Sequence, residues 1–171
     1  IRTILVLVLA TTCRAAAPTF VNVSAIAAST GADVTVTLPA HLTNDIFLMI
    51  GVVRDQNDTV TVAGWTAMTG SPFNRNTVSR YWVFWLRAAS AGETNPLFDK
   101  STATGDTYVM VALYRGAITT GDPWEVKGTP VTTTVDPSVI TGITALTDES
   151  LIVVPVAGED NNNASIITTG T

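Results

Sequence analysis

The chain has 171 residues, of which 46% are apolar and only 13% are charged. Ordinary globular proteins carry about 25% charged residues, so this chain has ample material for a core and few charges for its surface. A net charge of −5 excludes the usual basic nucleic-acid-binding protein. One cysteine and one histidine exclude an internal disulfide, a cysteine-rich zinc site and a multi-histidine metal site.

The polar surface must come largely from threonine, of which the chain has 29. Threonine is β-branched and favours strands. A hydroxyl also costs less to desolvate than a charge does. Two interpretations follow: the outer faces contact other subunits, or the protein is a secreted β-protein with a neutral surface.

Residues 1–17 begin with an apolar run over residues 1–10. The run is shorter than the roughly 20 residues that span a bilayer, so no membrane span is expected. One interpretation is an extended strand arm that its own domain or a neighbouring chain must cover. The other is a retained signal-like segment with Ala15 to Ala17 as the cleavage site, which Arg14 and Pro18 disfavour. For the arm, the expected assembly contacts are Ile4, Val6 and Val8.

From residue 18 onward, apolar and threonine-rich segments alternate with turn residues, which is typical of strands rather than helices. Val34 and Val36 alternate with threonines and predict a half-buried strand. The unbroken apolar run at 46–53 predicts a strand buried on both faces. Turns are predicted at 29–31 and at 55–58. The predicted strands cover residues 19–27, 33–38, 46–53, 59–63, 79–87, 106–114, 131–135, 151–157 and 164–168.

This pattern predicts an all-β fold. It is an antiparallel β-sandwich, jelly-roll-like, with an N-terminal extended strand arm at 1–17 and one sandwich domain at 18–171.

Residues 46–62 have an echo at 150–166: an apolar strand, an Asp/Asn-rich turn and a Thr/Ser/Val strand. Either any two hairpins of one sandwich look alike, or a hairpin is duplicated. In the second case the later copy stops short, so the chain is a fragment or a neighbour completes the sheet. Both versions of that case predict an open strand edge near the C-terminus, and open edges pair with other strands. Ile166 is the expected assembly contact there.

The segment 79–87 is the most aromatic part of the chain. Strand alternation places Tyr81, Val83 and Trp85 on one face, and Trp82, Phe84 and Leu86 on the other. The segment is either a central strand with both faces covered, or a strand with one face free for a subunit or a stacked sugar ring. The candidate sugar-stacking residues are Trp65, Trp82, Trp85 and Trp124.

Few residues suggest chemistry. A lone His41 in a predicted turn has no placed carboxylate or nucleophile, and a hydrolase would need an acid pair such as Asp99 and Asp106 that nothing brings together. The loops around Asp55 and Asp58 and around Asp160 offer oxygen ligands for calcium but lack the EF-hand spacing. Simple turn formation explains both loops, so no cofactor or metal and no enzymatic activity are expected.

Several motifs occur in a familiar order: Val62-Ala63-Gly64-Trp65-Thr66, the aromatic strand, Tyr114-Arg115-Gly116 and Asp122-Pro123-Trp124. Over residues 18–171 the sequence resembles β-sandwich structural modules of tailed-bacteriophage virions and related secreted bacterial proteins. Those modules often carry a Pro-Ala-Gly-Trp-Thr turn and a Tyr-Arg-Gly strand end. The sequence departs from the first motif at Val62, where proline is usual. The resemblance implies a capsid decoration, head-fibre or tail-associated protein, and it implies no catalytic residues.

The leading hypothesis is therefore a non-enzymatic structural protein, present in many copies on a virion surface. Its partners would be copies of itself and other particle proteins. One alternative is a carbohydrate-binding module or adhesin that binds a surface glycan. Another is an extracellular filament or surface-layer subunit.

Overall fold

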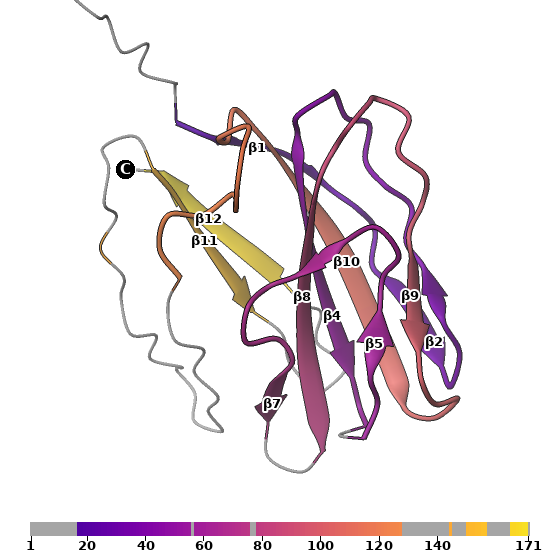
Figure 1. The fold of residues 1–171 in the computed structure, drawn as a ribbon. Coiled ribbons are helices and arrows are strands. Elements are labelled where there is room, and N and C mark those ends of the chain that lie inside the picture. The colour runs from indigo at the N-terminus through magenta and orange to yellow at the C-terminus, as the bar shows by residue number, and fades with distance from the viewer. Residues whose placement is uncertain are drawn as a thin grey trace, which may run out of the picture.

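The computed structural model describes residues 17–55, 57–75, 78–127, 144, 150–156 and 165–170. These residues form antiparallel sheets that pack against each other, with no helix among them, which confirms the all-β sandwich (Figure 1). The jelly-roll connectivity stays a prediction. The described strands are β1 (Thr19–Val23), β2 (Ala27–Thr30), β3 (Val34–Thr35), β4 (Ile46–Val53), β5 (Val60–Thr61), β6 (Thr66–Ala67), β7 (Phe73–Arg75), β8 (Ser79–Arg87), β9 (Leu97–Lys100), β10 (Asp106–Arg115), β11 (Leu151–Val156) and β12 (Ser165–Gly170).

The central sheet has the strand order β1-β10-β4-β8-β6, with β2 also paired to β10 and β7 also paired to β8. All eight residues of β4 are buried, as the unbroken apolar run predicted. An antiparallel strand is buried on both faces only when layers cover both sides of its sheet. The smaller sheet β3-β9-β5 and the hairpin β11–β12 lie against opposite faces of the central sheet.

The first core lies between the central sheet and β3-β9-β5. Phe98 of β9 is fully buried and rests over Gly51 of β4. A Cβ atom at Gly51 would lie 2.3 Å from the Phe98 ring, so glycine is the residue that lets the two sheets approach here. The buried members of this core are Val34, Val36, Phe47, Met49, Val53, Val60, Val62, Trp82, Phe84, Ala88, Phe98, Val109, Val111 and Leu113.

The second core lies on the opposite face of the central sheet. Leu151 and Val153 of β11 pack against it, so the hairpin covers this face at least in part. The predicted alternation of β8 is confirmed, because Trp82 and Phe84 belong to the first core and Val83 to the second. The buried members of the second core are Ile46, Leu48, Val83, Ala112 and Tyr114.

The strand predicted at 19–27 was wrong in its extent. It is divided into β1 and β2, both paired with β10, because the hydroxyl of Ser24 replaces a backbone partner. The Ser24 amide donates to the Val111 carbonyl at 2.8 Å, and the Val111 amide donates to Ser24 Oγ at 2.9 Å. The predicted turn at 29–31 was also wrong in position: β2 continues to Thr30, and the turn is made by Gly31 at a φ of 72°.

The interpretation of residues 46–62 and 150–166 as a duplicated hairpin was wrong as well. β11 and β12 pair with each other, whereas β4 and β5 lie in different sheets and β5 pairs with β9. The chain thus passes from one layer to the other between β4 and β5. Sequence alternation describes a strand's faces but not its neighbours. The strand predicted at 131–135 lies outside the described residues.

Candidate functional site

The hairpin β11–β12 has two unequal edges. Pro155 of β11 lies opposite Ile166 of β12. Proline has no N–H, so this pair must be a non-hydrogen-bonded pair, in which both backbones point away from the partner strand. Because the pairs alternate along the ladder, the N–H and C=O groups of Ile166, Thr168 and Gly170 all point toward the outer edge of β12.

The outer edge of β11 carries the complementary residues Leu151, Val153 and Pro155. The proline removes one of its three donors, which is a common way to protect a sheet edge from pairing. The edge of β12 contains no proline and no charge over Ser165–Gly170. Within the described part of the chain, β12 pairs with β11 alone. Ile166, predicted as an assembly contact, therefore has its backbone on an edge with which no other described strand pairs.

β1 forms a second edge, at the end of the central sheet. All five of its residues are exposed, and Phe20 is 45% exposed although its ring contacts Tyr114 edge-to-face at 5.9 Å. This edge is less regular than that of β12. Pro18 precedes it, and the register shifts between Phe20 and Asn22 as in a β-bulge. The arm residues Ile4, Val6 and Val8 lie outside the described residues.

Two of the predicted sugar-stacking tryptophans belong to the first core. Trp82 is 7% exposed, and its ring stacks on Phe84 with a centroid separation of 6.0 Å. Trp65 packs on Phe47 at 5.9 Å after the turn at Gly64, whose φ is 79°. The buried face of Trp82 cannot stack on a sugar, so its proposed role was wrong. The misassignment arose because strand alternation predicts on which side of the sheet a side chain lies, but not whether another layer packs on that side.

The other two tryptophans meet on the opposite face of the sheet. The rings of Trp85 and Trp124 contact each other edge-to-face at 5.8 Å. The Arg87 guanidinium lies 5.6 Å from the centre of the Trp85 ring and donates to the carbonyls of Ile118 and Gly121 at 2.8 and 3.1 Å. These contacts hold the loop that carries Trp124 against β8. The Trp85 ring is thus engaged by Trp124 and Arg87 of the same chain.

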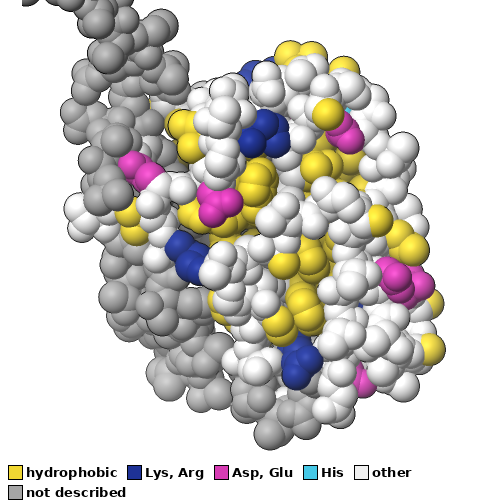
Figure 2. All heavy atoms as spheres, viewed as in Figure 1, with side chains coloured by type: hydrophobic (Ala, Val, Ile, Leu, Met, Phe, Trp, Pro, Cys, Tyr) yellow, Lys and Arg dark blue, Asp and Glu magenta, His cyan; other side chains and the backbone are white. Residues whose placement is uncertain are grey.

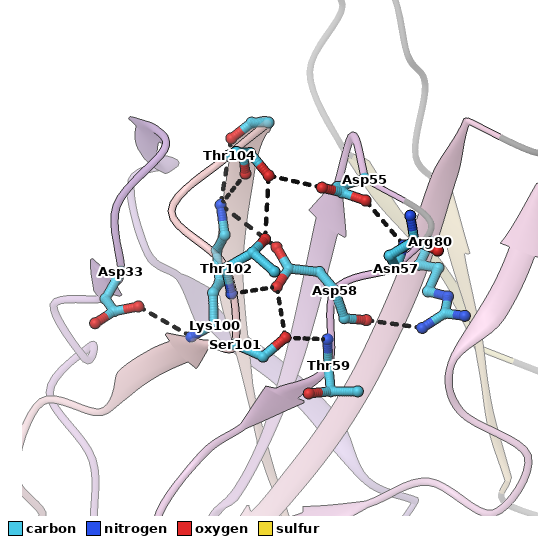
Figure 3. A network of polar contacts seen from close by, with 11 residues as sticks. Asp33, Asp55, Asn57, Asp58, Thr59, Arg80, Lys100, Ser101, Thr102 and Thr104 are labelled. Carbon is cyan, nitrogen blue, oxygen red and sulfur yellow. Dashed lines mark hydrogen bonds and ion pairs between the residues drawn. The ribbon is translucent and has the colours of Figure 1, made fainter.

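The predicted calcium ligands Asp55 and Asp58 lie together but have protein partners (Figure 3). Asp55 accepts hydrogen bonds from the Thr104 hydroxyl and the Asn57 amide, and these two contacts, the first above all, lower its pKa. The Asp58 carboxylate faces the Lys100 ammonium, with 3.7 Å between Oδ2 and Nζ. Asp160 lies outside the described residues, and no group of three potential metal-binding side chains occurs within them.

Asp45 and Arg115 form a bidentate ion pair at one end of the central sheet. Arg115 donates from Nε to Oδ1 at 2.8 Å and from Nη2 to Oδ2 at 2.7 Å. Asp45 Oδ2 also accepts the Leu42 amide at 2.8 Å. The hydrogen bonds from Arg115, together with that amide, lower the pKa of Asp45 despite its burial. The strand-end arginine noted in the sequence therefore holds the turn that precedes β4.

His41 packs against the first core and contacts backbone groups of two neighbouring segments. Its ring contacts Phe47 edge-to-face at 4.8 Å, its Nε2 accepts the Glu93 amide at 3.1 Å, and its Nδ1 lies 2.8 Å from the Pro39 carbonyl. An Nε2 that accepts a hydrogen bond leaves the proton on Nδ1, where it is donated to Pro39. The acids Asp99 and Asp106 are not brought together: Asp106 pairs with Arg54 and Thr30, and Asp99 is exposed on β9.

Sequence reasoning missed the buried residue Lys100. Strand β9 reads Leu97-Phe98-Asp99-Lys100 and alternates exposed and buried positions. Only one of its two buried residues is apolar, so the alternation is too weak to predict a strand.

Comparisons with protein-family models, with curated proteins and with solved structures found no significant match. No helix long and apolar enough to cross a bilayer occurs in the described part of the chain.

Proposed function

We propose that this chain is a non-enzymatic structural subunit that assembles in many copies on the surface of a virus-like particle, as a decoration, head-fibre or tail-associated protein. The observation that carries the proposal is the edge of β12, where Ile166, Thr168 and Gly170 direct their backbone groups outward. A regular, uncharged edge is a template for a strand from another chain.

The surface composition supports the same function. Charged side chains on the face seen in Figure 2 are few and stand apart, with uncharged and apolar side chains between them. A surface of this kind loses little free energy when another subunit desolvates it. The overall charge of −5 is small enough that close packing of copies requires little work against repulsion.

A glycan-binding function receives less support. Trp82 is buried, Trp65 packs on Phe47, and Trp85 lies against Arg87 and Trp124. Trp124 alone would then have to form the stacking platform. Tryptophan fluorescence during titration with a panel of glycans separates the two functions, since an assembly subunit should show no saturable response.

The direct test is sedimentation of particles from the native source, followed by quantitative mass spectrometry. A surface subunit should sediment with the particles at a fixed, high copy number and should resist washing with salt, because backbone pairing of uncharged strands is insensitive to screening. A chain that stays in the supernatant as a monomer would contradict the proposal.

A further inference from the structure

A lysine and an aspartate are buried together between β5 and β9. Lys100 is the last residue of β9, and Asp58 precedes β5 by two residues. Neither side chain is exposed, and the distance from Nζ to Oδ2 is 3.7 Å. Val60 pairs with Lys100 in the ladder, so the two side chains come from adjacent segments. Removing an ion pair from water in this way carries a large desolvation cost.

The two oxygens of the Asp58 carboxylate have different surroundings. Oδ1 accepts hydrogen bonds from the Ser101 hydroxyl at 3.0 Å and from the Thr102 amide at 2.9 Å. Oδ2, which faces the lysine, is buried and has no hydrogen-bond partner among the described residues. Two donors on one carboxyl oxygen resemble an oxyanion hole, because they would stabilise negative charge that develops on that oxygen.

The Lys100 amine is held in place beside this carboxyl group. Its Nζ donates to the Thr104 carbonyl at 2.7 Å and to the Gly105 carbonyl at 3.3 Å (Figure 3). The backbone amide of Lys100 donates to Asp33 Oδ1 at 2.9 Å, which fixes the base of the side chain. A nucleophile and a carboxyl group are thus fixed close together in a dry site, an arrangement that lowers the entropic barrier to reaction.

We propose that Lys100 and Asp58 form an intramolecular amide bond between Nζ and Cγ, with release of one water molecule. The ammonium first transfers a proton to Oδ2, and the neutral amine then attacks Cγ. The new C–N bond places the negative charge on Oδ1, where Ser101 and Thr102 hold it. The nitrogen transfers a second proton to Oδ2, the Cγ–Oδ2 bond breaks, and water leaves. No oxidant, nucleotide or other reactant is required.

The polar contacts already present fit the product. The amide oxygen keeps both donors that now bind Oδ1, and the amide N–H keeps the Thr104 carbonyl as its acceptor. The oxygen without a partner is the one that leaves. A neutral amide whose donor and acceptor are satisfied costs less to bury than two charges. The bond would tie the segment before β5 to β9, independently of how the protein assembles.

Mass spectrometry of the intact, denatured protein tests this directly. The wild-type chain should be lighter than its sequence mass by one water molecule, and tandem spectra should contain a branched peptide that joins the Asp58 and Lys100 segments. The water loss should disappear in Lys100→Arg and Asp58→Ala and persist in the control Asp99→Ala, which removes an exposed acid next to Lys100.

Two results would overturn the bond. One is a wild-type chain at its full sequence mass, with Lys100 free in the peptide map. The other is a water loss that persists in Lys100→Arg, which would place the modification elsewhere. Both conclusions rest on covalent mass alone, so they hold even if a variant folds poorly.

Discussion

Pro155 of β11 lies directly opposite Ile166 of β12, and this pairing fixes the direction of every backbone group in the hairpin. The proline removes a donor from the outer edge of β11 and none from the ladder. The edge of β12 keeps all of its outward groups. Among the described strands, one edge of the hairpin is blocked by proline and the other has no partner, which favours addition of a single strand. Pairing of β12 with its copy in a second chain would therefore close as a two-fold dimer rather than extend as a fibre.

Replacement of Gly51 by alanine should destabilise the protein by about 1–3 kcal/mol, the usual cost of overpacking a core. The new methyl group would lie 2.3 Å from the Phe98 ring, which is fully buried. Chemical denaturation measures the change. Gly92→Ala is the matched control, because that glycine is exposed and its nearest neighbour would be a serine oxygen at 3.7 Å. Equal stability of the two variants would contradict the packing described here.

Ser24→Ala should cost about 1 kcal/mol, because the Val111 amide would lose its acceptor in the middle of β10. Ser24→Thr keeps the hydroxyl and should restore most of the loss. Hydrogen exchange at the Val111 amide gives a local readout and should accelerate in the alanine variant only. Unchanged exchange in Ser24→Ala would show that the hydroxyl does not replace a strand partner.

The Asp45–Arg115 pair should contribute to acid stability. Hydrogen bonds from Arg115 lower the pKa of Asp45 in the folded state, so the unfolded chain binds the proton more readily. The contribution is complete above the unfolded carboxyl pKa of about 3.9 and is lost as the pH falls through the lower folded value. Asp45→Asn should remove about 1–2 kcal/mol at neutral pH, less than a fully buried pair because Arg115 is 43% exposed.

Denaturation at several pH values checks this, and the stability difference between wild type and Asp45→Asn should shrink toward low pH. Asp106→Asn is the control, since its contact with Arg54 is long, at 3.4 Å, and largely exposed. That change should stay within about 0.5 kcal/mol. If the stability difference between wild type and Asp45→Asn grew as the pH falls, the ionised Asp45 carboxylate would not be the stabilising form.

The strands with strong patterns were predictable from the sequence. The continuous run at 46–53 and the aromatic alternation at 79–87 match β4 and β8 residue for residue. A long apolar segment can be buried only in a few ways, so its local pattern carries most of the information.

Pairing partners were not predictable. Nothing in residues 59–63 indicates that β5 pairs with β9 rather than with β4. The pairing partner depends on contacts between residues far apart in the sequence. The buried partner of Asp58 was missed for a different reason. Lys100 is charged, and charged residues are normally expected on the surface. The open edge was expected near the C-terminus, but its direction follows only from the register of Pro155 with Ile166.

Copies of this chain should associate through the edge of β12, and sedimentation velocity of paired variants is the experiment that decides this. Thr168→Pro removes an outward N–H and leaves the β11–β12 hydrogen bonds in place, as Pro155 does on the other strand. Thr168→Ala keeps that N–H and is the matched control, and hydrogen exchange at the Val154 and Ile167 amides reports whether the hairpin is intact. We expect wild type and Thr168→Ala to self-associate and Thr168→Pro to sediment as a monomer with the hairpin preserved. Equal association of all three chains, or a monomeric wild type, would contradict association through the edge of β12.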